Sequence, residues 1–168
     1  IIRQGKDEFG YVGIKAEFEA EGTRPDELLR LIEISHKAGV NIAIKIGGCE
    51  AITDLLETRQ LGVDYIIAPM IESPYALSKY IDAKNKVYTP EERQDTKFLF
   101  NLETIESYNR LDGLVNQAVV PSGADGIVFG RVDFASSIGL SKENINSEKI
   151  TDYVLEVARA CREKKLEM

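Results

Sequence analysis

Short apolar runs alternate along the chain with longer stretches in which apolar residues recur at helical spacing. A continuous apolar run of about four to eight residues is typical of a strand that is buried on both faces, as in a parallel sheet. The sequence predicts five such strands: Tyr11–Phe18, Asn41–Ile46, Val63–Ala68, Lys97–Thr104 and Ile127–Phe129.

The stretches between these strands carry helix start and stop signals. Pro25 suits the first turn of a helix because it lacks only an amide that would be unpaired there, and Gly39 suits the position after the last turn. Ser73 and Pro74 form a similar start signal. Five helices are predicted: Pro25 to Gly39, Glu50 to Leu61, Ser73 to Lys86, Ile105 to Gln117 and Ser147 to Lys164.

Strands that alternate with helices predict an α/β protein with a parallel sheet, in a single domain spanning residues 1–168. Two architectures compete, a (β/α)8 barrel and a doubly wound open sheet. The glycine motifs of nucleotide-binding open sheets are absent. Polar residues instead follow every strand, which favours the barrel, whose loops meet at one face: Glu19, Glu21, Lys45, Glu72, Glu103 and Asp133. A complete barrel needs eight strands and about 250 residues, so a partial barrel is predicted.

Composition and charge restrict the kinds of molecule that this protein is expected to bind. The chain is 43% hydrophobic and 29% charged, as in ordinary globular proteins. Its net charge of −7, without a basic block, argues against nucleic acid or an anionic membrane as the main partner. No apolar run approaches the roughly 18 residues of a membrane span. Cys49 and Cys161 are too few for a disulfide framework, so we expect a reducing, cytoplasmic location.

Two carboxylates carry the most specific chemical prediction. Glu103 ends the fourth predicted strand and Asp133 falls just after the fifth. Because successive parallel strands end at one edge of the sheet, the two side chains are expected to lie side by side as ligands of a divalent metal. Their hard oxygen atoms favour Mg2+ over zinc. The alternative is a structural role as helix N-caps or loop acceptors.

Three motifs resemble the HpcH/HpaI aldolase/citrate lyase family. Leu99–Thr104 (LFNLET) is similar to the strand whose glutamate binds the metal in that family, and Gly126–Phe134 (GIVFGRVDF) to the strand whose aspartate is the second ligand. Ala68–Ser73 (APMIES) is similar to a third strand exit. The resemblance implies barrel strands two to six of a longer protein, and Glu103 and Asp133 as ligands of Mg2+ or Mn2+.

The resemblance also implies a reaction. Family members are carbon–carbon lyases that act on a 2-oxo acid or related carboxylate through a metal-stabilised enolate. Two positions differ here. No histidine follows the first predicted strand, where Glu19 and Glu21 could carry the proton instead. Lys45 stands where the family has an arginine and keeps the positive charge without the bidentate fork.

Several roles remain open for the flanking residues. Lys45 could stabilise an enolate, form a structural ion pair with Glu19, Glu21 or Glu72, or form a Schiff base. Arg131 could bind a substrate carboxylate or point to solvent. Gly47 and Gly48 could bind an anion or simply form a tight turn. Glu72 could contact substrate or accept a hydrogen bond at a helix start.

The resemblance, together with the carboxylates at the strand ends, thus implies a magnesium-dependent aldolase or citrate-lyase-like enzyme with a small-molecule carboxylate substrate. Two other functions stay open: a non-catalytic ligand-binding barrel that lost its acid–base residue, and a phosphate-binding enzyme of the phosphoenolpyruvate/pyruvate type. Because an open barrel exposes strand edges and apolar lining, we also expect association into a homo-oligomer.

Overall fold

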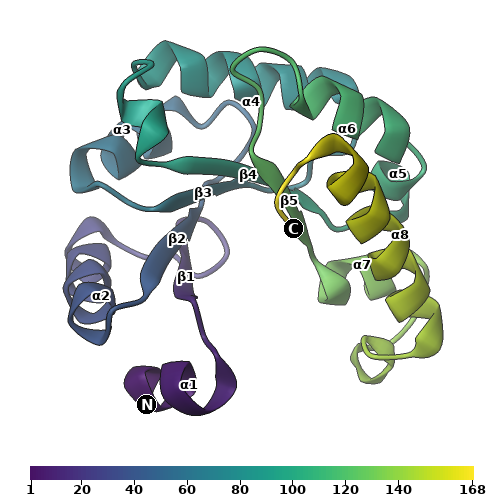
Figure 1. The fold of residues 1–168 in the computed structure, drawn as a ribbon, viewed down its shortest axis with the longest axis horizontal. Helices are drawn as coiled ribbons and strands as arrows, with labels where there is room; N and C mark the ends of the chain where they lie inside the picture. Colours follow the sequence, from purple (N-terminus) through teal and green to yellow (C-terminus); the bar gives the residue numbers. More distant parts are fainter.

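A computed structural model describes all residues, 1–168, and contains one five-stranded parallel sheet (Figure 1). The five predicted strands are all present with slightly shorter bounds. They are β1 (Gly13–Glu17), β2 (Asn41–Lys45), β3 (Tyr65–Ala68), β4 (Lys97–Leu102) and β5 (Gly126–Phe129).

The strands lie side by side in chain order, β1-β2-β3-β4-β5, and every neighbouring pair is parallel. A doubly wound sheet reverses its strand order near the middle, which opens a crevice at that point. No such reversal occurs here, so each strand is added on the same side of the preceding one, as in a barrel. The sheet is the curved wall of a barrel with five of its eight strands.

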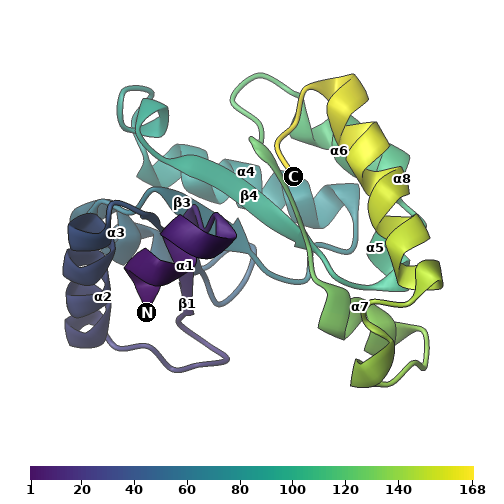
Figure 2. The same cartoon turned by 60° about the horizontal axis from the view of Figure 1, so that its bottom comes forward.

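Helices cover the convex outer face of this wall (Figures 1 and 2). Neighbouring helices pack against one another in turn: α3 on α4, α4 on α6 and α6 on α8. The eight α-helices are α1 (Ile2–Phe9), α2 (Pro25–Ala38), α3 (Ile52–Leu61), α4 (Pro74–Val87), α5 (Ile105–Tyr108), α6 (Leu111–Ala118), α7 (Arg131–Ser137) and α8 (Glu148–Lys164).

The hydrophobic core lies between the sheet and these helices. Alternate strand residues such as Ile44, Ile66 and Phe100 are fully buried in it. The residues between them form the inner face of the wall, where Lys45 of β2 pairs in register with Glu17 of β1. This alternation explains why the strands are not uniformly apolar: charged residues are confined to the inner face and the strand ends.

The predicted helix signals act as expected. The Ser73 hydroxyl accepts a hydrogen bond from the Ala76 amide (3.1 Å) at the start of α4. Gly39 ends α2 with φ 67°, a left-handed conformation that glycine adopts without the steric cost that other residues incur. Ser147 likewise caps α8 through the Ile150 amide.

Three helical features differ from the predictions. The chain begins with α1, a helix that the pattern did not indicate, and Lys6 and Arg3 of α1 donate hydrogen bonds to carbonyls at the end of α2. The stretch from Ile105 to Gln117 forms two short helices rather than one. Residues after β5 start α7 at Arg131, where a loop was expected.

Two aspartates fix neighbouring strands at the amino-terminal edge of the sheet. Asp64 directly precedes β3, and its carboxylate accepts a hydrogen bond from the Ile42 amide of β2 (2.8 Å). Asp125 directly precedes β5, and its carboxylate accepts one from the Phe98 amide of β4 (2.8 Å). The same contact therefore recurs two strands later.

The two sides of the sheet differ. After α8 the chain returns to β5, where Gly126 and Glu167 form a parallel bridge, with Ile127 donating to the Glu167 carbonyl (2.9 Å). On the opposite side, β1 pairs only with β2. None of the helices combines the length and the apolar character needed to cross a bilayer.

Candidate active site

A cluster of charged side chains occupies the inner face at the carboxyl ends of the strands. The Lys45 ammonium lies 3.6 Å from Glu103 Oε2 and 3.9 Å from Glu17 Oε2. Lys15, two residues before Glu17, pairs with the other oxygen of the same carboxylate. Two carboxylates and two ammonium groups therefore balance one another, and the Glu17 and Glu103 side chains are largely buried.

Strand register brings these residues together. Glu17 is the last residue of β1 and Lys45 the last of β2, and the two are direct partners in the parallel ladder. Glu103 directly follows β4. Because alternate residues of a strand share a face, Asn101 and Glu103 both lie on the inner face with Lys45. The cluster thus combines three strands that are separated by helices in the sequence.

Glu103 is the most enclosed member of the cluster. It is 1% exposed, and its two carboxylate oxygens have different partners. Oε1 accepts a hydrogen bond from the Met70 amide (2.9 Å), and Oε2 accepts one from the Asn101 side-chain amide (2.7 Å). Met70 has φ 50°, which is uncommon for a residue other than glycine, and its hydrogen bond to Glu103 holds that conformation.

Next to Glu103 lies a buried acceptor without a partner. Asn101 Oδ1 has no hydrogen bond, although its amide nitrogen donates to Glu103. Buried polar atoms in native proteins are nearly always paired with protein, water or an ion. An unpaired oxygen beside a buried carboxylate is therefore typical of a position that also interacts with a bound species.

Asp133, the second predicted ligand, is exposed and lies in the first turn of α7. The residue before that helix is Gly130, whose backbone packs so closely on Glu103 that an added Cβ would lie 3.0 Å from Oε2 and 2.6 Å from the Glu103 Cβ. Asp133 lies three residues after Gly130 in the sequence, and it forms no hydrogen bond or ion pair with Glu103. No group of three or more carboxylate, histidine or cysteine side chains converges here or elsewhere.

The predicted ligands and their buried neighbour Asn101 offer oxygen atoms, the type of donor that a hard divalent cation prefers. Glu103 and Asp133 offer carboxylate oxygens and Asn101 an amide oxygen, and neither sulfur nor imidazole belongs to the cluster. Mg2+ takes only one or two protein carboxylates and completes its shell with water and substrate, so two carboxylates are sufficient.

The other predicted proton carriers lie outside the contacts of Lys45. The Glu21 carboxylate accepts a hydrogen bond from the Glu17 amide (3.2 Å), and therefore orders the loop behind the cluster. Glu19 is exposed and packs against Gly47, where an added Cβ would meet its carboxylate at 2.6 Å. Lys45 does form ion pairs, but with Glu17 and Glu103 rather than with Glu19, Glu21 or Glu72.

The glycine turn has an acidic lining. The Gly47 amide already donates to the Asp54 carboxylate (2.7 Å), and Glu19, Glu50 and Asp54 all border the pocket around the turn. An anion would lose one of its expected donors and meet like charges there. The tight-turn interpretation of Gly47 and Gly48 therefore agrees better with these contacts.

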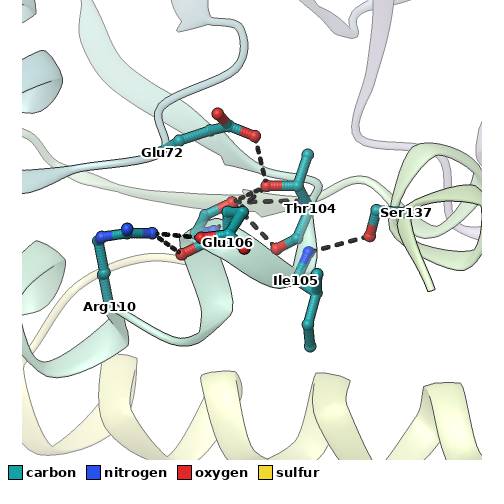
Figure 3. Close-up of polar contacts among 7 residues, drawn as sticks. Glu72, Thr104, Ile105, Glu106, Arg110 and Ser137 are labelled. Atoms are coloured by element: carbon teal, nitrogen blue, oxygen red, sulfur yellow. Dashed lines mark hydrogen bonds and ion pairs between the residues drawn. The ribbon is translucent and has the colours of Figure 1, made fainter.

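Arg131 and Glu72 are both engaged with the protein. Arg131 donates to the Ile145 carbonyl (3.1 Å) and the Asn146 side chain (3.3 Å), which ties the start of α7 to the segment before α8. Glu72 accepts a hydrogen bond from the Thr104 hydroxyl (2.9 Å), directly after Glu103 (Figure 3). Glu72 thus links the β3–α4 loop to the β4–α5 loop.

Sequence reasoning missed two members of the cluster, Glu17 and its partner Lys15. Glu19 and Glu21 were predicted as site residues because they follow the first strand and loops carry most site residues, whereas Glu17 belongs to the strand itself. A signal was present: with the five strands aligned in parallel, Glu17 and Lys45 are both last residues of their strands and have opposite charges.

Comparison with known proteins shows what fold this is. No known protein family matches the sequence, and no curated protein sequence matches it either. Solved structures do match. The HpcH/HpaI aldolase from Desulfitobacterium hafniense DCB-2 superposes with a TM-score of 0.79 at 16% identity, covering 98% of this chain and 70% of that one.

Two further structures match over nearly the same length. Citrate synthase SbnG has a TM-score of 0.76 at 16% identity, covering 99% of this chain and 70% of that one. Macrophomate synthase has a TM-score of 0.71 at 12% identity, covering 93% of this chain and 61% of that one. At such low identity the likeness establishes the fold, and the prediction of a partial α/β barrel is confirmed.

Proposed function

We propose that this chain carries the active-site half of a metal-dependent carbon–carbon lyase that acts on a 2-oxo acid or a related carboxylate. The main support for this proposal is the buried Glu17–Lys45–Glu103 cluster on the inner face of the barrel wall. It lies at the carboxyl ends of the strands, where barrel enzymes have their active sites. The similar structures are those of an aldolase and two synthases, which supports chemistry of this kind.

Each residue has a role that follows from its surroundings. Glu103, Asp133 and Asn101 would hold the cation with oxygen atoms. When bound, a divalent cation supplies Lewis-acid polarisation of a substrate carbonyl. Hydrogen bonds from Met70 and Asn101 fix the Glu103 carboxylate in one orientation, so its position needs no reorganisation when substrate arrives.

Lys45 supplies the positive charge of the protein itself. Its ammonium lies between two carboxylates on the inner face, where it could approach the oxygen of a bound 2-oxo acid. Negative charge that develops on this oxygen during enolisation is stabilised by a nearby fixed cation. Lys45 therefore takes the electrostatic role that the sequence suggested, in preference to a Schiff base, since its ammonium is already ion-paired.

Glu17 is the carboxylate that we assign to proton transfer. It contacts Lys45 directly, whereas Glu19 and Glu21 have no contact with the lysine. As a base, Glu17 would accept the proton from the carbon next to the substrate carbonyl and return it after the carbon–carbon step. Lys15, on the other oxygen of Glu17, then holds the carboxylate in place.

Deuterium exchange into pyruvate tests the proposal, because exchange requires enolisation but no second substrate. We expect magnesium-dependent exchange by the wild type and its loss in Glu103→Gln and Asp133→Asn. Calorimetry with Mg2+ and oxalate, an enolate mimic, should show binding to the wild type that both variants lose.

Glu106→Gln is the matched control for this experiment. Glu106 is an exposed carboxylate three residues from Glu103, and it pairs with Arg110 rather than with the cluster (Figure 3). The control should exchange and bind like the wild type. Exchange that continues undiminished in Glu103→Gln and Asp133→Asn would exclude the metal site.

A phosphate-binding enzyme that uses the Gly47–Gly48 turn receives no support from the geometry, since the Gly47 amide is bonded to Asp54 in an acidic pocket. The non-catalytic alternative predicts oxalate binding without exchange, so the same pair of measurements separates it from the lyase.

A further inference from the structure

A second pocket lies at the opposite, amino-terminal end of the strands. It has a volume of about 510 Å³, within the range of small-molecule sites. Its walls come from three connections: the end of α4 with the segment leading into β4, the α6–β5 loop, and the last turn of α8 with the residues after it. No residue of the Glu17–Lys45–Glu103 cluster lines it.

The lining of this amino-terminal pocket is strongly cationic, although the whole chain has a net charge of −7. Five lysine and arginine side chains face two carboxylates, which leaves an excess of three positive charges. Both carboxylates, Asp125 and Glu167, pair with Lys97 (3.6 and 3.4 Å). The remaining cations have no carboxylate partner within 4.0 Å: Lys84, Arg93, Lys164 and Lys165.

Lys84 is the exceptional member because its charge is buried. The residue is 2% exposed, and its ammonium donates to the Ser122 carbonyl (2.7 Å) and to Asn85 Oδ1 (2.9 Å). It also lies 5.0 Å from the centre of the Phe98 ring. These partners are neutral. Burial, with a smaller contribution from Arg93 and a partial offset by the negative charge of Asp125, lowers the pKa of Lys84 to about 8, so the group remains mostly charged at neutral pH.

Arg93 brings a second cation to the same acceptor. Its guanidinium donates to Asn85 Oδ1, the oxygen that Lys84 also uses. Two like charges thus converge on one neutral atom, an arrangement that costs free energy unless an anion joins them. Ser122 has φ 56°, and its carbonyl accepts from both Lys84 and Asn85. The backbone is therefore shaped around these groups.

We propose that this pocket binds the phosphate group of a small molecule, with Lys84 and Arg93 as the principal contacts and Lys164 and Lys165 at the rim. A phosphate carries up to two charges and several acceptor oxygens, which matches one buried ammonium, one guanidinium fork and two exposed ammonium groups. A monocarboxylate would satisfy only part of this set. The site is separate from the lyase chemistry and stands whether or not that proposal holds.

Calorimetric titration with inorganic phosphate at constant ionic strength tests the proposal on the whole chain. We expect saturable one-site binding to the wild type, and affinities that are about 10- to 100-fold lower for Lys84→Met and Arg93→Gln. Lys86→Gln is the matched control, because Lys86 is an exposed lysine of the same helix that does not line the pocket. Its affinity should equal that of the wild type.

Two further titrations identify the ligand class. Glycerol 3-phosphate should bind more tightly than inorganic phosphate if the natural ligand is a phosphate ester, and no more tightly if it is the free ion. Acetate should bind at least tenfold more weakly than either. Thermal melting of each variant verifies folding, and Arg93→Gln changes a half-exposed residue, so the test survives if Lys84→Met does not fold.

Three results would overturn the proposal: no saturable phosphate binding by the wild type, equal loss of affinity in Lys86→Gln, or acetate binding as tight as that of phosphate. The first would exclude a site. The second would show a general effect of net charge, and the third would show that the pocket does not distinguish phosphate from other anions.

Discussion

The two ends of the strands differ in how their buried charges are paired. At the carboxyl end, Lys45 is placed between Glu17 and Glu103, and every charge in the cluster has an opposite charge nearby. At the amino end, Lys84 and Arg93 share one neutral oxygen and have no carboxylate partner. At the carboxyl end the charges are paired directly, whereas at the amino end Lys84 and Arg93 form no ion pair, and the pocket carboxylates Asp125 and Glu167 pair with Lys97.

This difference has a physical meaning. A buried ion pair gains Coulomb energy that offsets the loss of hydration, whereas an unpaired buried cation keeps the full desolvation cost. Removal of one partner from the Glu17–Lys45–Glu103 cluster should therefore lower the free energy of unfolding. Removal of the buried cation from the amino-terminal pocket should raise it.

Glu103→Ala should produce the largest loss of stability. It would leave the Met70 amide, the Asn101 amide and the Lys45 ammonium without their shared acceptor. Breaking a buried ion pair typically costs about 3–5 kcal/mol of unfolding free energy. Urea unfolding measures this quantity, with Glu106→Ala as an exposed control that should change by less than about 0.5 kcal/mol. Similar losses in both variants would show that burial of Glu103 is not decisive.

Lys45→Met should mainly reduce enolisation. Removal of one fixed charge that stabilises a developing oxyanion typically lowers the rate by about 10²–10³-fold. Magnesium-dependent deuterium exchange into pyruvate measures the rate. Lys45→Arg keeps the charge and should retain a larger share of the exchange, so equal losses in both variants would argue against an electrostatic role.

Lys84→Met should raise the free energy of unfolding, which Glu103→Ala should lower. The substitution replaces a buried ammonium that forms no direct ion pair by an apolar side chain of similar length. We expect the unfolding free energy at pH 7 and low phosphate to rise by about 1–2 kcal/mol, as seen when buried charges are replaced by apolar groups. Lys86→Met should leave it nearly unchanged. A clear loss of stability in Lys84→Met would mean that the hydrogen bonds of the ammonium outweigh its desolvation.

The pH dependence of stability should also distinguish the wild type from Lys84→Met. Because burial lowers the pKa of Lys84 from 10.5 to about 8, the unfolded chain binds this proton more tightly than the folded chain between those values. The wild type should therefore gain stability relative to Lys84→Met as the pH rises from about 8 to about 10.5, by about 3 kcal/mol at most. Other alkaline groups titrate in both proteins and cancel. Parallel stability curves would contradict the lowered pKa.

The sequence predicted the barrel wall well because its signals are local. Apolar runs marked the five strands, and Ser73, Gly39 and Ser147 act as the expected helix boundaries. The helix α7 was not expected, because Arg131–Ser137 is short and lies in a stretch that also resembles a strand exit. Its formation moves Asp133 from a loop to the exposed first turn of a helix.

The sites were predicted only in part, because they depend on register and on side-chain contacts. Lys45 and Glu103 were recognised as strand-end residues, but their partner Glu17 depends on which residue of β1 faces Lys45. The amino-terminal pocket had no sequence motif. Lys84 looked like one of several lysines of α4, and only the fold shows that it alone is buried against the α6–β5 loop.

The aspartate contacts at the amino-terminal edge of the sheet also bear on residues at the carboxyl ends of the strands. If β4 slipped by one residue against β5, Glu103 would turn from the inner to the outer face. The hydrogen bond from the Phe98 amide to Asp125 opposes such a slip at the far end of the strand. Asp125 also borders the cationic pocket. Asp125 thus has two structural tasks, because the same carboxylate that holds β4 in register with β5 also forms part of the wall of the cationic pocket.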